Sequence, residues 1–308
     1  MPIYNILLNS SNVSNSNNMY YTYNFISGNF EIQEDAEICI SSISMPYSWF
    51  NINQSYYNNA KFSFYFGGST LYNITFQDGF YLTSDINNYI ESFCITNNLY
   101  KTNNSTGNNV YYIYVFSNST YYSNQFLLYP IESTTQTGYT YPVGFPFSSG
   151  NITPQLNFLS SSNFGNILGF NSGLYPLTTS TSAVSILSNK TPNATTVNSI
   201  TVRCNLVNNE CTTPSDIMDN FPINSTFGSN ISYSPSYEKW VGIKQGSYSR
   251  LLIYFQDQNL NPIIATDNNV SISLLIKQSR KKLDIIKEKI LKNIKSLDFQ
   301  DENKEDEL

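Results

Sequence analysis

The sequence contains no histidine among its 308 residues. Histidine is the commonest general base, the commonest metal ligand and a member of every Ser-His or Cys-His pair, so its absence excludes those catalytic arrangements. Charged residues make up only 12% of the chain, about half of the roughly 25% that is usual. The sequence has no G-x-x-x-x-G-K-[ST] and no C-x-x-C motif, and so gives no support to a phosphate loop or a zinc site. We therefore predict no catalytic residues, no metal and no cofactor.

Long apolar runs are missing as well. No segment approaches the roughly 20 apolar residues of a membrane-spanning helix. The opening stretch "MPIYNILLNSSNVSN" lacks the basic region and the apolar run of a signal peptide. We expect a soluble protein made in a reducing compartment, with no membrane span.

Cysteine is rare, at four residues. Cys39 and Cys94 stand in the apolar contexts "EICISSI" and "IESFCI", which is typical of small core residues. Cys204 and Cys211 lie on either side of an Asn-Asn pair in "VRCNLVNNECTT". They could face each other across a hairpin, so a disulfide between them stays open.

What the sequence does contain is aromatic and turn-forming residues, including Tyr 25 and Phe 20. Short runs such as "KFSFYF", "VYYIYVF", "SRLLIYF" and "VSISLLIK" combine residues that favour strands, and Asn, Gly, Ser or Pro residues bound most of them. In "KFSFYFGGSTLYNITF", Gly67 and Gly68 can supply the positive φ of a tight hairpin. Many short strands separated by turns predict an all-β sandwich or barrel.

Two segments interrupt the strands with helical patterns. In "DGFYLTSDINNYIESFCI", Ser84 can cap a helix whose apolar residues share one face. That face comprises Ile86, Tyr89, Ile90 and Phe93. In "SSNFGNILGFNSG", Asn163 can cap one short turn that Gly169 ends. Residues 130–198 are the richest in Ser, Thr, Gly and Pro, which predicts a loop-rich insertion.

Acidic residues cluster at two places. Those in "NFEIQEDAEI" predict a solvated polar turn that enters a strand, in preference to a glycosidase-like pair of carboxylates. They are Glu31, Glu34, Asp35 and Glu37. Asp216 and Asp219 in "TPSDIMDNF" fit the start of a short helix with Ser215 as its cap.

Basic residues concentrate at the C-terminal end, where residues 277–308 hold nine of the 16 lysines and arginines. Residues 277–295 carry eight basic side chains against two acidic ones, a net charge of +6, whereas 296–308 carry one lysine against six acids, a net charge of −5. Apolar residues recur there at helical spacing, so we predict a basic amphipathic helix followed by an acidic tail. The candidate partner-binding residues are Lys277, Arg280, Lys281, Lys282, Lys287, Lys289, Lys292 and Lys295.

Four stretches carry a resemblance to a known family. In chain order they are "ITFQDGFYLTSDINNYIESF", "SNFGNILGFNSGLYP", "VRCNLVNNECTTPSDIMDNFPINSTFGSNISYSP" and "LLIYFQDQNLNPIIATDNNVSISLLIK". Together they resemble the penton proteins, the vertex or minor capsid proteins, of virophages and polinton-like viruses, over about residues 36–277.

The resemblance implies a single jelly-roll β-sandwich with an insertion. Together with the composition, it predicts a jelly roll of residues 1–129 and 199–276 around the insertion at 130–198. Residues 277–308 lie outside the resemblance, and their charge and apolar pattern predict an appended tail. The resemblance also implies a homopentamer at each vertex of an icosahedral virion, beside hexon-like trimers of a major capsid protein, made in the host cytoplasm or a viral factory. The tail would bind packaged DNA or an internal capsid protein on the inner surface, or a neighbouring capsomer. A solvated tail without a partner is the plainer alternative.

A second function fits the same composition. Tyrosine-rich loops and a long insertion would also serve a carbohydrate-binding, lectin-like viral attachment module. The oligomeric state separates the two, since a vertex protein forms fivefold rings and a lectin binds glycans as a free monomer or trimer.

Overall fold

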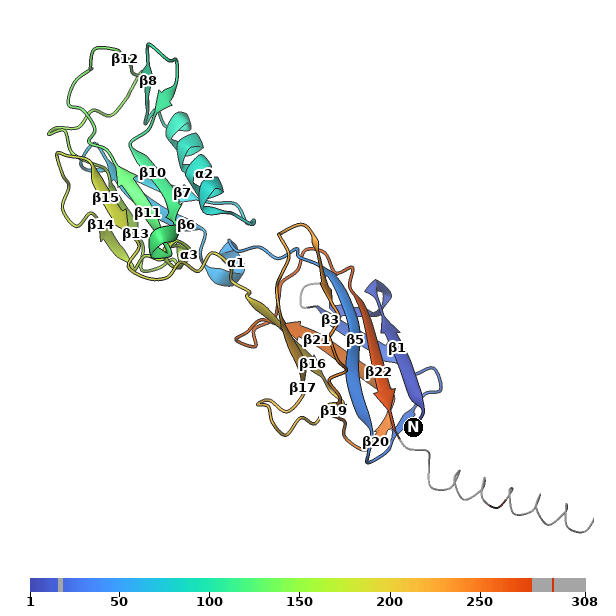
Figure 1. The fold of residues 1–308 in the computed structure, drawn as a ribbon. Helices are drawn as coiled ribbons and strands as arrows, with labels where there is room; N and C mark the ends of the chain where they lie inside the picture. Colours follow the sequence, from blue (N-terminus) through green and yellow to red (C-terminus); the bar gives the residue numbers. More distant parts are fainter. Residues whose placement is uncertain (16–18, 279–289, 291–308) are drawn as a thin grey trace, which may run out of the picture. The chain divides into compact units, whose positions relative to one another are not determined.

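The computed structural model describes residues 1–15, 19–278 and 290 of the chain. The chain forms two compact units (Figure 1). The first, which we call the sandwich unit, combines Met1–Ser48 with Val197–Leu308, and the second, the inserted unit, is Trp49–Thr196. Among the described residues, no helix is long and apolar enough to cross a membrane.

These limits differ from the predicted ones. The insertion was expected at residues 130–198, between jelly-roll parts at 1–129 and 199–276, but the inserted unit starts at Trp49 and ends at Thr196. The last residue of the inserted unit therefore lies close to the predicted residue 198, whereas its first residue lies far from the predicted residue 130. Strand-like segments between residues 61 and 128 build the inserted unit; their alternation shows that they are strands but not which sheet they join. The predicted helix and acidic tail at 277–308 lie outside the described residues, apart from Lys277, Gln278 and Ile290.

The sandwich unit contains two antiparallel sheets. The first has the order β1-β22-β5-β18, with β19 also paired to β5, and the second has the order β17-β16-β21-β3-β2. The strands of the first sheet are β1 Ile3–Leu8, β5 Glu37–Pro46, β18 Asn230–Tyr233, β19 Val241–Gly242 and β22 Ser271–Lys277. Those of the second are β2 Val13–Asn15, β3 Tyr20–Asn24, β16 Ser199–Cys204, β17 Ile217–Pro222 and β21 Arg250–Gln256. A small two-stranded sheet pairs β4 Phe30–Ile32 with β20 Gly246–Tyr248, and the 3₁₀ turn η1 is Ser10–Asn12.

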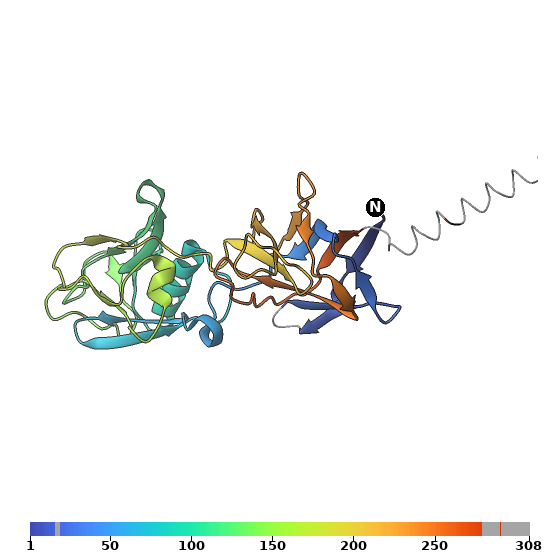
Figure 2. The same cartoon turned by 90° about the horizontal axis from the view of Figure 1, so that it is seen from below.

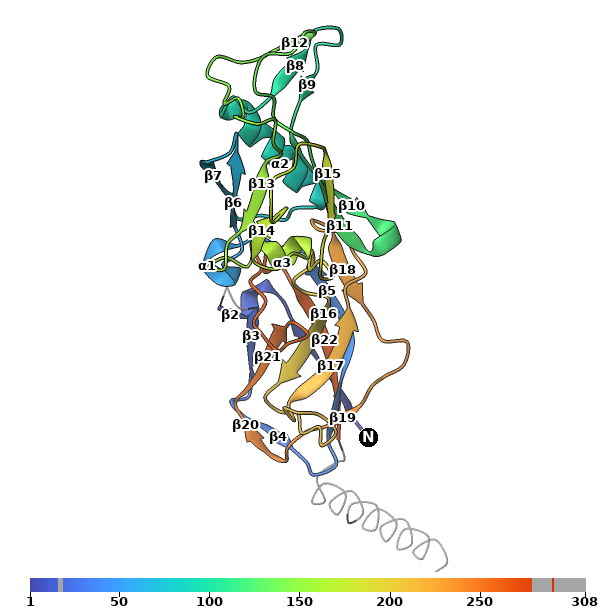
Figure 3. The same cartoon turned by 90° about the vertical axis from the view of Figure 1, so that its left-hand side faces the viewer.

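The strand order identifies the sandwich as a jelly roll. Its eight main strands can be numbered 1 to 8 in chain order, namely β1, β3, β5, β16, β17, β18, β21 and β22. In that numbering the first sheet has the strand order 1-8-3-6 and the second has the order 5-4-7-2. This is the arrangement of two interlocked Greek keys. Figure 3 shows β16, β17 and β21 near β5 and β22 in this unit. The prediction of an all-β jelly roll is confirmed, and the inserted unit joins its third strand to its fourth.

Alternation of side chains builds the core of the sandwich. In β22, Ile272, Leu274 and Ile276 are buried, and in β21 Leu251 and Ile253 are buried as well. The residues between them in β22 are half-buried or exposed. Each such apolar side chain contributes about 1.5–3 kcal/mol when it leaves water. The period of two seen in the sequence therefore fixes which face of each strand points inward.

The inserted unit is also mostly β. One sheet has the order β14-β13-β6-β7, a second β10-β11-β15, and a third β12-β8-β9. Their bounds are β6 Lys61–Phe66, β7 Thr70–Thr75, β8 Lys101–Asn103, β9 Asn109–Val110, β10 Ile113–Asn118, β11 Ser123–Leu128, β12 Tyr139–Thr140, β13 Gln155–Phe158, β14 Gly173–Tyr175 and β15 Val184–Leu187. The helices are α1 Gln54–Tyr57, α2 Thr83–Thr96 and α3 Phe164–Leu168, with the 3₁₀ turn η2 at Ser119–Tyr121. The predicted hairpin is present, with Gly67 and Gly68 at φ of 67° and 112°.

Both predicted helices form, with corrections at both caps: the Asn163 side chain does not cap α3 and instead donates to the Tyr57 carbonyl at 2.9 Å. α2 buries Ile86, Ile90 and Cys94 and packs on β10, but it begins at Thr83 after Leu82. Ser84 therefore lies inside the helix, and the carboxylate of Asp85 accepts the Leu82 N–H at 2.9 Å instead, as an acidic residue in a first helical turn can. The short helix α3, yellow-green in Figure 2, follows Asn163 and ends at Gly169, which has φ of 82°.

The cysteines are free thiols. Cys39, Cys94 and Cys204 are buried and Cys211 is exposed. The disulfide that the sequence left open between Cys204 and Cys211 is therefore not formed in the structure. Burial is the main cause that raises the pKa of the Cys39 thiol to about 11 and of the Cys94 thiol to about 12. These thiols are protonated at neutral pH and serve as small core residues, as predicted.

Candidate functional site

The edge strand β1 carries exposed apolar side chains on the sandwich unit. Among the described strands β1 pairs only with β22, so its other edge has no strand beside it. Ile6 and Leu8 point into the core, whereas Ile3 and Leu7 are 59% and 58% exposed. Protein edge strands commonly carry charges or proline that discourage pairing with another chain. The strand sequence IYNILL contains neither, so this edge suits contact with another protein surface.

An aromatic group lies at the start of the strand, on the face opposite to Ile3 and Leu7. Tyr4 of β1 meets Phe30 edge to face at 5.3 Å between ring centroids, and Phe30 stacks on Phe25 at 5.0 Å. They border a cavity of about 200 Å³, and Ile26 at its edge is 95% exposed. The term "β1 surface" below means the free edge of β1 together with its exposed residues Ile3 and Leu7.

Lys277, the first of the predicted cationic residues, is the last residue of β22. The Lys277 Nζ lies 2.7 Å from the Glu37 carboxylate and 4.1 Å from the centroid of the Trp240 ring. An ion pair and a cation–π contact thus engage Lys277 within the sandwich. The other candidate residues lie outside the described part of the chain, namely Arg280, Lys281, Lys282, Lys287, Lys289, Lys292 and Lys295.

The described part of the sandwich ends beside the acidic turn that the sequence predicted. The Gln278 side chain accepts the backbone N–H of Gln33 at 3.1 Å and donates to the backbone carbonyl of Glu31 at 3.2 Å. Between β4 and β5 the chain turns through Glu34 and Asp35. The polar turn entering a strand is confirmed, and it places negative charge at the point from which residues 279–308 depart.

The acidic residues near position 216 do not begin a helix, which corrects the prediction made with Ser215 as a cap. Asp216 precedes the strand β17 and receives two hydrogen bonds from Arg203, at 2.8 and 2.7 Å, and one from the Tyr254 hydroxyl. Asp219 lies in β17 and accepts a hydrogen bond from Lys239 at 2.9 Å. Pairing with cations overrides the local capping preference, and both carboxylates are held in structural ion pairs.

The Asp216 pair predicts a pH dependence of stability. Burial alone would raise the pKa of Asp216, but hydrogen bonds from Arg203 and Tyr254 outweigh it and hold the pKa below its ordinary value of 3.8. The pair therefore contributes stability above the unfolded-state pKa, and the contribution is lost as pH falls through the folded-state value. We expect Asp216→Asn to lower the unfolding free energy by about 1.5–3 kcal/mol at pH 7, with a smaller deficit at pH 3. Urea midpoints at both pH values measure it; an equal deficit at both would contradict the assignment.

The inserted unit contains a buried ion pair of its own. Lys101 and Glu132 are each 8% exposed and contact each other directly. Lys101 also donates to the Gln136 side-chain oxygen at 3.0 Å, and the Tyr112 hydroxyl donates to Glu132 at 2.5 Å. Burial, and next the hydrogen bond to Glu132, raise the pKa of the Tyr112 hydroxyl far above its ordinary range, so it stays a donor. Every polar group of this cluster has a partner, which is the arrangement of a structural network.

Within the described residues, no group of three or more Cys, Asp or Glu side chains is placed to hold a metal ion. Asp216, Asp219, Glu132 and Lys277 are each held in an ion pair within the chain. The β1 surface, by contrast, has no strand beside it among the described residues.

Similarity to known proteins is found among solved structures. No family model matches the sequence, and no curated protein matches it. Among solved structures, the chain is similar to a selenomethionine-labelled penton protein of mavirus, with a TM-score of 0.42, 10% identity, and coverage of 89% of this chain and 98% of that one. It is also similar to the structure of the Sputnik virophage by cryo-EM, with a TM-score of 0.36, 10% identity, and coverage of 89% and 96%.

Proposed function

We propose that this chain is a structural capsid protein that forms the pentameric vertex of an icosahedral virus or virophage shell. The observation that carries the proposal is the uncharged, apolar edge of β1 on a jelly-roll sandwich. The four sequence stretches that resemble penton proteins support it independently. The role is structural and not enzymatic, and it places the protein in the virion, assembled in the host cytoplasm or a viral factory.

The geometry of a ring explains what the β1 surface has to do. In a five-membered ring each subunit contacts its neighbour through two different surfaces, because a cyclic interface above twofold symmetry is heterologous. An edge that offers unpaired backbone groups together with Ile3 and Leu7 suits one half of such a contact. The other lateral surface of a copy provides the second half. The outward surfaces of the ring then contact the hexon-like trimers of the major capsid protein.

A charge placed on β1 tests the interface. Because Leu7 is 58% exposed, Leu7→Lys should leave the fold intact, but it should bury an unpaired ammonium in the assembled ring and break it. We expect the variant to sediment as a monomer when the unaltered chain sediments as a pentamer. Val143→Lys, at an apolar position that is 95% exposed in the inserted unit, is the matched control and should stay pentameric. Pentamers of equal stability in both variants would remove β1 from the interface.

We propose further that residues 279–308 act as an appendage that binds packaged DNA or an internal capsid protein. Truncation after Gln278 keeps the contacts of that side chain with Gln33 and Glu31, so we expect a melting temperature within about 2 °C of the full chain. The truncated chain should lose any DNA affinity that falls steeply with salt, as binding through lysines does. Filter binding at 50 and 200 mM salt measures this. Unfolding of the sandwich on truncation would contradict the appendage assignment.

A further inference from the structure

A small cavity opens in the inserted unit where α2, the η2 turn and the segment around Pro192 meet. Its volume is about 200 Å³. That is smaller than the roughly 300–1,000 Å³ of pockets for drug-sized ligands. None of the residues that line it carries a charge. The cavity therefore fits one small neutral ring, not an extended chain or an ion.

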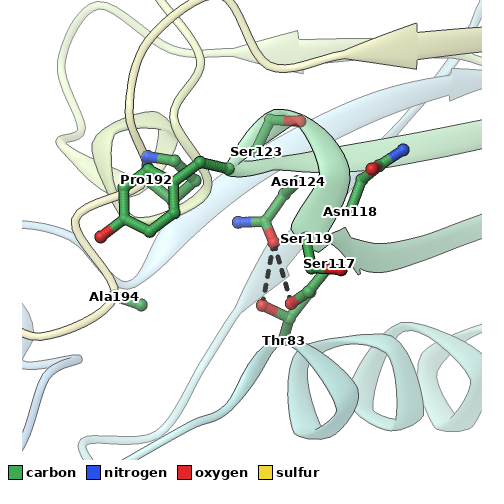
Figure 4. A pocket seen from close by; sticks show the side chains of 9 residues that line it. Thr83, Ser117, Asn118, Ser119, Ser123, Asn124, Pro192 and Ala194 are labelled. Carbon is green, nitrogen blue, oxygen red and sulfur yellow. Dashed lines mark hydrogen bonds between the residues drawn. The ribbon is translucent and has the colours of Figure 1, made fainter.

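The floor of the cavity is a preformed hydrogen-bonding group. Asn124 is 3% exposed, and its side-chain oxygen accepts from the hydroxyls of Thr83 at 3.1 Å and Ser117 at 3.3 Å (Figure 4). Its amide nitrogen donates to the Leu168 carbonyl at 3.3 Å. Because both hydroxyls donate their protons to Asn124, their oxygen lone pairs can accept hydrogen bonds from a ligand. A ligand that supplies O–H donors would match this floor.

The opposite wall is apolar. Pro192 and Ala194 lie across the cavity from Thr83 and Ser117 in Figure 4, and the Tyr122 side chain also lines it. Tyr122 is 78% exposed and has φ of 49°, a left-handed conformation that bulky residues rarely adopt. Such strain persists where the surrounding structure holds it, and functional sites are enriched in it. Here it follows the η2 turn and keeps an aromatic side chain at the mouth of the cavity.

We propose that this cavity binds a single neutral sugar residue of a glycan. A pyranose ring has hydroxyls along its edge, which would donate to the acceptors of the floor, and apolar C–H faces, which would pack on Tyr122 and Pro192. A sialylated or sulfated sugar is disfavoured, because its anion would enter the cavity without a cationic partner. A purely apolar ligand is disfavoured too, because it would leave Thr83 and Ser117 desolvated without new partners. The site gives the inserted unit a surface-recognition role that is separate from assembly through the sandwich unit.

The test uses the full chain on an array of glycans that end in neutral hexoses, N-acetylhexosamines or deoxyhexoses, together with their sialylated and sulfated counterparts. We expect binding to be confined to neutral termini, and calorimetry with the best free oligosaccharide then gives the affinity. Tyr122→Gly should weaken that affinity at least tenfold while the melting temperature stays equal or rises, because glycine adopts positive φ freely. Thr83→Val, which removes only the hydroxyl, should weaken it as well.

Tyr121 supplies the matched control. It is 66% exposed and adjacent in sequence but does not line the cavity, so Tyr121→Gly should bind the oligosaccharide as the unaltered chain does. The proposal is overturned by an absence of binding to every neutral glycan, by a preference for charged termini, or by equal affinity in Tyr122→Gly. None of these results bears on pentamer formation, so the two proposals fail independently.

Discussion

Replacing Phe62 by alanine is expected to lower the unfolding free energy of the inserted unit by about 3–5 kcal/mol. Phe62 in β6 is fully buried and stacks on Phe164 of α3 at 5.2 Å and on Phe158 of β13 at 5.8 Å between ring centroids. Truncation removes the contacts of a whole ring and leaves a cavity between a helix and two strands, which the aromatic neighbours fill only in part. The effect should exceed that of any surface substitution in the unit.

Hydrogen-exchange mass spectrometry across a urea titration measures this change, because peptides from β6 and β21 report separately on the two units. Tyr121→Ala, at an aromatic residue that is 66% exposed, is the control and should change stability by less than about 0.5 kcal/mol. A loss below about 1 kcal/mol for Phe62→Ala would show that the aromatic cluster is not the core of the inserted unit.

The second large effect concerns the buried ion pair. Glu132→Ala should destabilise the inserted unit by about 3–5 kcal/mol, because it leaves the buried Lys101 ammonium without its counter-charge. It also removes the acceptor of the Tyr112 hydroxyl. Glu132→Gln keeps an acceptor for Tyr112 and should cost less. The order Glu132→Ala, Glu132→Gln, unaltered chain should appear in urea midpoints of the inserted unit.

A double-mutant cycle separates the pair from its surroundings. Lys101→Met combined with Glu132→Leu replaces both charges with apolar groups of similar size, and such replacements are often neutral or stabilising. The double variant should therefore be more stable than Glu132→Leu alone, which leaves the Lys101 ammonium buried without its counter-charge. Additive losses in the cycle would show that the two side chains do not interact, contrary to their direct contact.

The sequence predicted the sandwich well, because strand patterns are local. Alternating residues such as Ile272, Leu274 and Ile276 specify a strand and its inward face. The start of the inserted unit at Trp49 was missed for the same reason: runs such as 61–66 and 70–75 have the same period as the jelly-roll strands. Which sheet a strand joins depends on tertiary pairing, and the alternation of its residues carries no signal of that pairing.

The candidate site was harder to predict from the sequence than the fold. The place of β1 at the edge of a sheet follows only from the topology. The signal that could have indicated it is the absence of charge in the first 15 residues. The helix expected at Asp216 was wrong because Arg203, distant from it by 13 positions, decides its environment. Lys277 was expected to bind a partner, and in the structure it contacts Glu37 and Trp240. The pairing of β22 with β5 places Lys277 opposite Glu37, and this register cannot be predicted from the sequence.

The absolute mass of the purified 308-residue chain tests the central claim most directly. Multi-angle light scattering at low and moderate salt should give five times the chain mass of 35.0 kDa, and negative-stain images of that species should contain fivefold views. A chain that stays monomeric or trimeric, even when mixed with its major capsid protein, would contradict the vertex assignment.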